Sequence, residues 1–266
     1  MNSRTEEVIT VPRFVRLKGR RPIVMVTAYD FPMAQLVDQA GVDGILVGDS
    51  LAMVVQGRPN TLSVTWEQML YHAEMVGRAV QRALVVVDFP FPLSQLEPAQ
   101  VLTHAAEALR LPGVSAVKLE GGQELVPTVQ RLVRAGVPVM AHCGLRPQSV
   151  HRLGGYRVQR DRQTLLQEAL ALQQAGAFAV VVECVAASLA QELTQALQVP
   201  TIGIGAGPHC DGQVLVLHDL LGLNTGPLPK FAKAYAQLAS TIRQAVEAFC
   251  QEVRQRRYPG PEHSYE

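Results

Sequence analysis

The sequence predicts an α/β protein built as a (β/α)8 barrel, and three observations carry this prediction. Eight short runs rich in Val, Ile and Leu alternate along the chain with segments of helical periodicity. The runs are almost continuously apolar, which is typical of parallel strands that are covered on both faces. Eight such units in 266 residues fit one closed barrel, whereas a doubly wound open sheet is the weaker alternative.

Each expected strand is bounded by Gly, Pro or Asp, and the eight lie at 23–28, 44–47, 83–87, 116–119, 138–141, 179–182, 201–204 and 214–217. The expected helices lie at 33–40, 66–80, 98–110, 126–135, 164–175 and 188–197. A glycine follows three of the helices, at Gly41, Gly136 and Gly176, where it can adopt the left-handed backbone that ends a helix. The repeated units therefore agree in their helix ends as well as in their strands.

Two connections, 51–65 and 144–162, are longer than a barrel requires. Both follow the carboxyl end of a strand, where barrel enzymes place their active-site loops. We expect residues 1–266 to form one barrel domain, with a polar tail from about 253 to 266.

Composition narrows the class of protein. Hydrophobic residues make up 48% of the chain and charged residues 18%, which indicates a globular protein. The 24 basic and 23 acidic side chains almost cancel, so no nucleic-acid or membrane partner is expected. The chain shows neither a secretory signal nor a membrane span, and its four widely spaced cysteines match no zinc or disulfide pattern. Reduced thiols in a cytoplasmic protein are therefore expected.

Ionisable residues follow six of the eight expected strands: Asp30, Asp49, Asp88, Glu120, His142 and Glu183. Lys118 lies two residues before Glu120, so both side chains project from the same side of that strand. In a parallel barrel all these positions gather at one mouth. Any one of these acids could instead cap a helix or close a loop, but six together favour a shared site.

Several carboxylates around one mouth repel one another unless a cation or protons offset their charge. Oxygen ligands without a suitably spaced Cys or His pair favour Mg²⁺ over zinc. Mg²⁺ can stabilise an enolate, and Glu183, which ends a very apolar run, is the best placed base for removing a proton beside a carbonyl. Lys118 would attract a substrate carboxylate, or would form a structural salt bridge.

Three other motifs offer alternatives to this site. The glycine-rich stretch 203–208 predicts either a backbone cradle for an anion or close packing. Ser50 with His142 could suggest a hydrolase, but no G-x-S-x-G motif surrounds Ser50. Cys143 and Cys184 are interpreted as small buried residues rather than nucleophiles.

Taken in order, the strand-end motifs resemble those of the ketopantoate hydroxymethyltransferase family over nearly the whole chain. They are VTAYD (26–30), LVGDSL (46–51), VDFPF (87–91), VKLEGG (117–122), GLRPQS (144–149), GGYRVQ (154–159), VECV (182–185) and IGIGAG (202–207). The resemblance implies a TIM barrel of the phosphoenolpyruvate/pyruvate type. It also implies transfer of a hydroxymethyl group from 5,10-methylenetetrahydrofolate to 3-methyl-2-oxobutanoate, giving ketopantoate for pantothenate and coenzyme A.

The resemblance also assigns roles to the matching residues. It implies magnesium ligands at Asp49, Asp88 and Glu120, keto-acid contacts at Asp49, Ser50, Asp88 and Lys118, and a proton acceptor at Glu183. Asp30 and His142 are left with supporting roles. Members of the family are cytoplasmic and typically decameric, so a homo-oligomer that binds a keto acid and a folate is expected.

The mechanism expected from these roles is a Mg²⁺-stabilised enolate formed when Glu183 removes the C3 proton of the keto acid. One rival is a magnesium-dependent lyase or mutase of the phosphoenolpyruvate mutase and isocitrate lyase kind. Such enzymes usually carry a Lys-Cys-Gly-type loop, and this sequence has none. Another rival is a catalytically silent barrel that binds ligands or assembles with partners.

Overall fold

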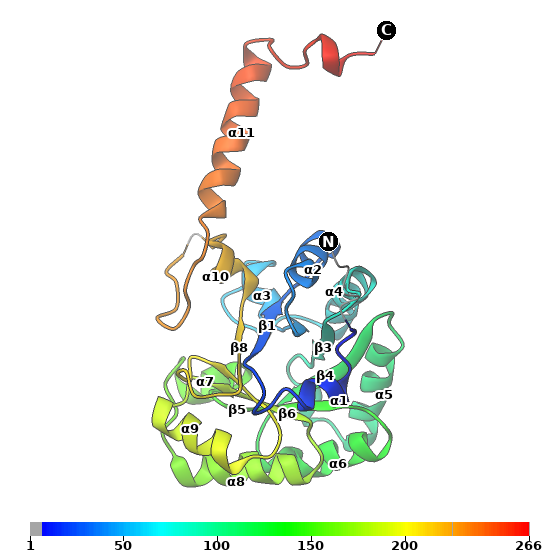
Figure 1. Ribbon diagram of the computed structural model, residues 1–266, viewed down its shortest axis with the longest axis vertical. Helices are drawn as coiled ribbons and strands as arrows, with labels where there is room; N and C mark the ends of the chain where they lie inside the picture. The colour runs from blue at the N-terminus through cyan, green and yellow to red at the C-terminus, as the bar shows by residue number, and fades with distance from the viewer. Residues whose placement is uncertain (1–6, 225, 266) are drawn as a thin grey trace. The chain divides into compact units, whose positions relative to one another are not determined.

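The eight strands form one closed parallel barrel in which each strand pairs with the next and β8 pairs with β1 (Figure 1). The computed structural model describes residues 7–224 and 226–265. Its internal contacts divide the chain into two compact units, Met1–Val216, which carries the barrel, and Leu217–Glu266. The predicted barrel is confirmed and the open sheet is wrong, while a single domain over 1–266 stays a prediction.

The strands lie close to the expected positions. They are β1 Ile23–Thr27, β2 Gly44–Val47, β3 Leu84–Asp88, β4 Val114–Glu120, β5 Val139–Gly144, β6 Ala179–Glu183, β7 Thr201–Ile204 and β8 Gly212–Leu215. Several extend further at their carboxyl ends than apolarity alone indicates. The parallel register continues through polar positions, since Asp88 pairs with Lys118 and Glu120 with His142. These ionisable residues therefore belong to the strands, which fixes their backbone.

Helices cover the outside of the barrel, and all six expected ones are present (Figure 1). The α-helices are α1 Val11–Val15, α2 Phe31–Gln39, α3 Leu51–Val54, α4 Trp66–Ala79, α5 Pro98–Leu109, α6 Val126–Arg134, α7 Val150–Leu153, α8 Arg162–Gln174, α9 Ala187–Ala196, α10 Leu217–Leu221 and α11 Leu238–Arg254. Gly41, Gly136 and Gly176 have φ values of 87°, 88° and 104°, which confirms the predicted helix ends. Between β7 and β8 the described chain has no helix.

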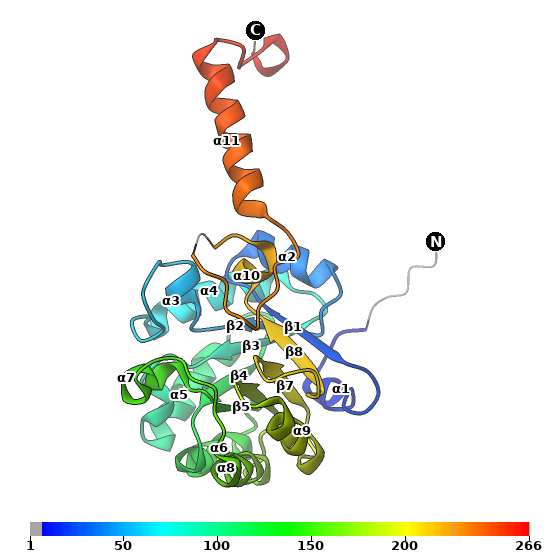
Figure 2. The same cartoon turned by 90° about the vertical axis from the view of Figure 1, so that its left-hand side faces the viewer.

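The two ends of the barrel are built differently. Figure 2 shows α3 and α7 at one end and α1 at the other. At the amino end, Phe14 of α1 is fully buried and meets Phe178 edge to face, with ring centroids 5.9 Å apart. Burying a phenylalanine side chain stabilises the fold by about 1.5–3 kcal/mol, so α1 closes this end with apolar contacts.

At the carboxyl end, α3 and α7 lie within the two connections that the sequence marked as long. One contact shows that these connections approach each other. The hydroxyl of Tyr156, just beyond α7, lies 3.9 Å from the sulfur of Met53 in α3. The two long connections therefore meet over the carboxyl end of the strands.

The unit Leu217–Glu266 contains α10, α11 and a short 3-10 helix, Pro261–His263. The region expected to be a polar tail begins inside the last turn of α11, and nearly all of its described residues are exposed. No residue of α11 is buried, although one face carries apolar side chains at Ile242, Val246, Phe249 and Val253. Within the described residues, no helix combines the length and apolarity needed to cross a membrane.

Candidate active site

A buried ion pair forms the centre of the carboxyl end of the barrel. Asp88 is the last residue of β3, and its Cα partner on β4 is Lys118. The ammonium of Lys118 donates to Oδ1 of Asp88 over 2.6 Å, and the two side chains are only 4% and 2% exposed. Burial alone would lower the pKa of Lys118, but the attraction of Asp88, Asp49 and Glu120 raises it. Lys118 therefore remains a buried cation among carboxylates.

Asp49 joins this pair from the end of β2. Its backbone N–H donates to Oδ2 of Asp88 over 3.3 Å, so the two acids are neighbours. Loss of hydration and the negative charge of Asp88 raise the pKa of Asp49 to about 7. The next residue, Ser50, has its hydroxyl 2.8 Å from that of Tyr29, which follows β1. The structure thus brings Asp49 and Asp88 together and fixes Ser50 beside them.

Glu120, His142 and Glu183 form a second group on the neighbouring strands β4, β5 and β6. His142 Nε2 lies 2.9 Å from the carbonyl oxygen of Leu145 and 3.4 Å from Oε2 of Glu183. The other ring nitrogen, Nδ1, lies 3.9 Å from Oε2 of Glu120 and has no hydrogen-bond partner among the described residues. Nε2 therefore carries the proton, because it faces two oxygen acceptors.

The protonation of this second group follows from its burial. Burial raises the pKa of Glu120 well above its usual range, and the nearby Asp49 raises it further. Burial also raises the pKa of Glu183 to about 8, although its side chain remains 16% exposed. The pKa of His142 falls well below its usual range because the ring is buried and Lys118 is close. A neutral imidazole thus lies between two carboxyl groups.

Carboxyl groups outnumber cations in this site, so they either bind protons, in keeping with the raised pKa values of Glu120 and Glu183, or require a metal cation. The buried ammonium of Lys118 faces four carboxyl groups, those of Asp49, Asp88, Glu120 and Glu183. A divalent cation would offset the excess, and hard carboxylate oxygens are the donors that Mg²⁺ prefers. Within the part of the chain that the structure describes, no three His, Cys, Asp or Glu side chains already converge on one metal position. The hard oxygen donors fit Mg²⁺, which usually keeps several positions for water and substrate oxygens.

Asp30, the remaining acid of the predicted set, caps α2 instead of facing these groups. Its carboxylate accepts a hydrogen bond of 2.9 Å from the backbone N–H of Met33. The capping role that the sequence left open is therefore present, and a supporting role in a reaction stays a prediction.

The cysteines near the mouth are poor nucleophiles. Cys143 is fully buried, and burial raises the pKa of its thiol to about 12. Burial raises the pKa of Cys184 to about 11. Since the thiolate is the reactive form, both residues remain protonated thiols, in agreement with their interpretation as small packing residues.

Sequence reasoning gave no role to Gln148, which the structure places inside the site. Its side-chain amide donates to Oδ2 of Asp49 over 3.0 Å, and its backbone N–H donates to Oε1 of Glu120 over 3.0 Å. Tyr156 was also missed, and its hydroxyl lies near the same acids, whose charges add to burial in raising its pKa. The available signals were the length of the connection 144–162 and its motifs GLRPQS and GGYRVQ, but which residues turn inward depends on the folded loop.

Comparison with known proteins agrees with this geometry. The model of a family described as ketopantoate hydroxymethyltransferase matches residues 8–261. The chain belongs to the ketopantoate hydroxymethyltransferase family. It is 55% identical over 259 residues to the 3-methyl-2-oxobutanoate hydroxymethyltransferase of Pyrobaculum calidifontis, covering 96% of this chain and 97% of that protein. The enzyme of the same name from Rhodopirellula baltica is 52% identical over 252 residues, covering 95% and 93%.

Solved structures with the same fold extend beyond the hydroxymethyltransferase family. Phosphoenolpyruvate phosphomutase from Streptomyces platensis subsp. rosaceus superposes with a TM-score of 0.64 at 16% identity, over 92% of this chain and 88% of that one. A phosphonopyruvate hydrolase, solved with oxalate and Mg²⁺, gives 0.61 at 14% identity, over 96% and 93%. At these identities the likeness concerns the fold, and it confirms the predicted type of barrel.

Proposed function

We propose that this protein transfers a hydroxymethyl group from 5,10-methylenetetrahydrofolate to 3-methyl-2-oxobutanoate, forming ketopantoate for pantothenate and coenzyme A synthesis. Family membership supports the reaction, and one feature of the site supports its chemistry most directly. Glu183 is a carboxyl group with a raised pKa beside a buried cluster of acids and one ammonium. A base whose pKa lies near neutrality is suited to removing a proton next to a carbonyl.

The keto acid would bind at the ends of β2, β3 and β4. Asp49, Ser50, Asp88 and Lys118 would contact it, with Lys118 supplying the positive charge that attracts the substrate carboxylate. Asp49, Asp88 and Glu120 would hold Mg²⁺, which when bound would polarise the ketone and stabilise the enolate charge. Burial strengthens each of these electrostatic interactions, because little water remains to screen them.

Glu183 would act as the general base. Its ionised carboxylate takes the C3 proton of the keto acid, and the electron pair of that C–H bond becomes the enolate. C3 then forms the new bond to the one-carbon unit of the folate. One water molecule enters overall, tetrahydrofolate leaves, and the oxygen of the new hydroxymethyl group comes from water. A positioned general base typically contributes about 10²- to 10⁴-fold to the rate.

His142 would support Glu183 without exchanging a proton itself. Because its Nε2–H lies 3.4 Å from Oε2 of Glu183, the imidazole favours the ionised carboxylate. The lowered pKa of His142 keeps the ring neutral in this position. The Nε2–H tautomer, held by the carbonyl of Leu145, is therefore the form that would assist the base.

We further propose a cytoplasmic homo-oligomer, with a decamer as the assembly typical of the family. The apolar face of α11 supports self-association, since Ile242, Val246, Phe249 and Val253 are each 44–55% exposed. Spacings of four, three and four residues place them on one side of the helix. Free thiols at all four cysteines suit a reducing compartment. Sedimentation velocity of the whole chain tests the assembly, and a monomer would refute it.

Proton NMR in D₂O tests the reaction. With 3-methyl-2-oxobutanoate, protein and Mg²⁺, we expect the C3 proton signal to disappear and the methyl doublet to collapse, and we expect EDTA to prevent both. Addition of methylenetetrahydrofolate should then yield ketopantoate. Exchange without product would leave an enolising enzyme with another co-substrate, while cleavage of the keto acid would indicate the rival lyase. Binding without exchange would indicate a silent barrel.

A further inference from the structure

Gln148 connects the ends of three strands through one residue. Its side-chain nitrogen donates to Oδ2 of Asp49 over 3.0 Å and to the carbonyl oxygen of Phe89 over 2.8 Å. Its backbone N–H donates to Oε1 of Glu120 over 3.0 Å. Two of the three acceptors, Asp49 and Glu120, are carboxylates that would hold Mg²⁺ in the proposed function. Both hydrogens of the amide are used, so its orientation is fixed.

The acceptors of Gln148 are themselves rigid. The backbone N–H of Phe89 donates to the carbonyl of Lys118 over 3.0 Å, and the Phe89 side chain is fully buried. Asp49 is tied through its own N–H to Asp88. The amide of Gln148 therefore holds Oδ2 of Asp49 next to the fixed carbonyl of Phe89. It does so as a neutral donor, which adds no charge to a site that holds four carboxyl groups and one ammonium.

The side chain of Gln148 is not what holds its loop in place. Arg146, two residues before Gln148, donates to Glu124 over 2.9 Å and to Glu168 over 2.6 Å. The Ser149 backbone N–H closes the short 3-10 turn onto the carbonyl of Arg146 over 2.9 Å. These contacts do not involve the amide, so the loop keeps them when the amide is removed.

We propose that Gln148 is a positioning residue for the cation site, orienting Asp49 through its side-chain amide and Glu120 through its backbone N–H. This inference rests on the proposed function, since it concerns the carboxylates that would hold Mg²⁺. Partners that hydrogen-bond to metal ligands fix the orientation of those ligands, and their loss typically weakens metal affinity or activity by about 10- to 100-fold. Removing the side-chain amide leaves the backbone donation to Glu120 intact. We therefore expect only a partial loss of cation affinity.

The test compares Gln148→Met with wild type and with Gln163→Met. Methionine has similar length and no donor, and Gln163 is an exposed glutamine on α8 that serves as the matched control. Mg²⁺ and Mn²⁺ are titrated calorimetrically into the metal-free, substrate-free protein, and unfolding is recorded in EDTA. We expect Gln148→Met to bind either cation about tenfold more weakly, with an unchanged unfolding midpoint in EDTA. Gln163→Met should match wild type throughout.

A second readout separates positioning from structural damage. The Mg²⁺ concentration that half-activates C3 proton exchange should rise about tenfold in Gln148→Met and stay at the wild-type value in Gln163→Met. Gln148→Asn should also bind the cation more weakly, because its shorter side chain cannot reach both Asp49 and the Phe89 carbonyl. It replaces Gln148→Met in the test if that variant fails to fold. Wild-type cation affinity in the folded variant would overturn the inference. Failure of the wild-type protein itself to bind Mg²⁺ would overturn the proposed cation site instead.

Discussion

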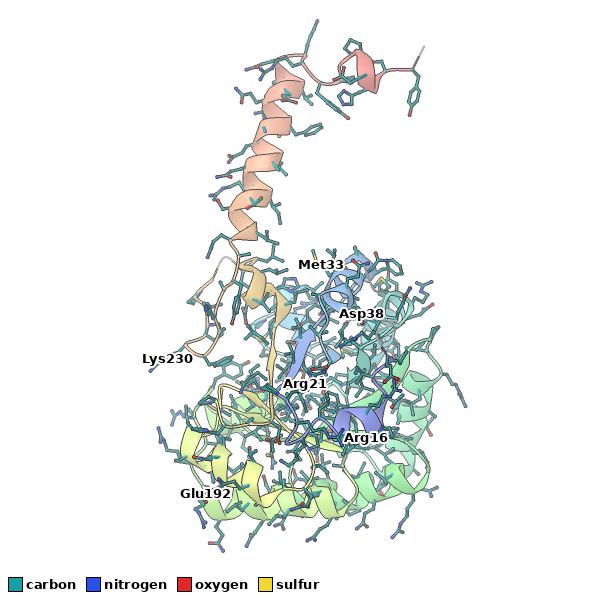
Figure 3. All side chains as sticks on the ribbon, viewed as in Figure 1. Arg16, Arg21, Met33, Asp38, Glu192 and Lys230 are labelled. Atoms are coloured by element: carbon teal, nitrogen blue, oxygen red, sulfur yellow. The ribbon has the colours of Figure 1, made fainter. Side chains whose placement is uncertain are left out.

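At the amino end of the barrel the carboxylates of Asp38, Asp43 and Asp211 each accept three hydrogen bonds, whereas at the carboxyl end four carboxyl groups share fewer donors. Asp43, which is fully buried, accepts from Arg21 over 2.5 and 2.8 Å and from the Val24 backbone N–H over 3.0 Å. Asp38, labelled with Arg21 in Figure 3, accepts from the backbone N–H groups of residues 81–83. Asp211 accepts from Lys18 and twice from Thr201.

The carboxyl end carries the same residue types with fewer donors, since Asp88 accepts from Lys118 and Asp49, and Gln148 donates to Asp49 and Glu120. There Lys118 is the buried cation near four carboxyl groups, and burial raises the pKa of Glu183 to about 8 and of Asp49 to about 7. Buried charge that is matched by donors supports the fold, while buried charge left unmatched is expected where a ligand or a proton completes it. The contrast predicts that substitutions at the two ends will separate activity from stability.

The largest expected effect is on catalysis at the carboxyl end. Glu183→Gln should lower the rate of C3 proton exchange by about 10²- to 10⁴-fold, because the amide cannot accept the proton. The keto acid should still bind, as calorimetry would show. Glu192→Gln, the same change at an exposed site on α9 (Figure 3), is the control and should exchange normally. Exchange by Glu183→Gln at the wild-type rate would remove Glu183 as the base.

The opposite outcome is expected at the amino end. Asp43→Asn should lower the free energy of unfolding by about 2–4 kcal/mol, because the buried Asp43 loses its charge beside the half-exposed Arg21 and its hydrogen bonds are disturbed. Denaturant unfolding measures this change. The exchange rate of the folded variant should equal that of wild type, so a large loss of kcat with unchanged stability would contradict the division between the two ends.

Added Mg²⁺ should stabilise the protein by binding the acids at the carboxyl end of the barrel, and not those at the amino end. At a Mg²⁺ concentration about 100 times the dissociation constant, the free energy of unfolding should rise by about 2.7 kcal/mol, and EDTA should remove the gain. Glu120→Gln should reduce this increment, whereas Asp43→Asn should keep it despite its lower starting stability. Thermal unfolding with and without Mg²⁺ provides the measurement, and equal increments in both variants would argue against Glu120 as a ligand.

The pH dependence of metal-free stability should have an unusual sign. Because folding raises the pKa of Glu183 from 4.5 to about 8, the folded protein binds more protons than the unfolded chain between these values. The free energy of unfolding therefore falls as pH rises through this window, by up to about 1.4 kcal/mol per pH unit for one proton. Unfolding in EDTA from pH 4.5 to 8.5 should show a shallower fall for Glu183→Gln. An equally steep fall in that variant would place the proton elsewhere.

The smallest effect is expected at the molecular surface. Arg162 donates to Glu192 over 2.6 Å, but the two side chains are 67% and 42% exposed. Solvent screens such pairs, so Glu192→Ala should change the free energy of unfolding by less than about 1 kcal/mol. A loss comparable to that of Asp43→Asn would show that burial is not what distinguishes the amino-end acids.

The sequence by itself determined the barrel and the positions of its chemistry. The β-strands alternate with helices at a regular period, so the order of elements predicts the closed sheet. Chain polarity in parallel strands then places Asp88, Glu120 and Glu183 at one mouth, since each ends its strand. The roles proposed for these residues come from the family's motifs, because spacing alone does not assign them.

Only the tertiary structure decided which groups touch and which do not. Asp30 and Asp49 both follow strands, yet one caps a helix and the other adjoins Asp88, because the local turn after each strand sets the direction of the side chain. The place of Gln148 against Asp49, 99 residues earlier, depends on how the connection after β5 folds back over the mouth. The raised pKa values likewise depend on burial and on neighbours distant in the sequence, which no local pattern encodes.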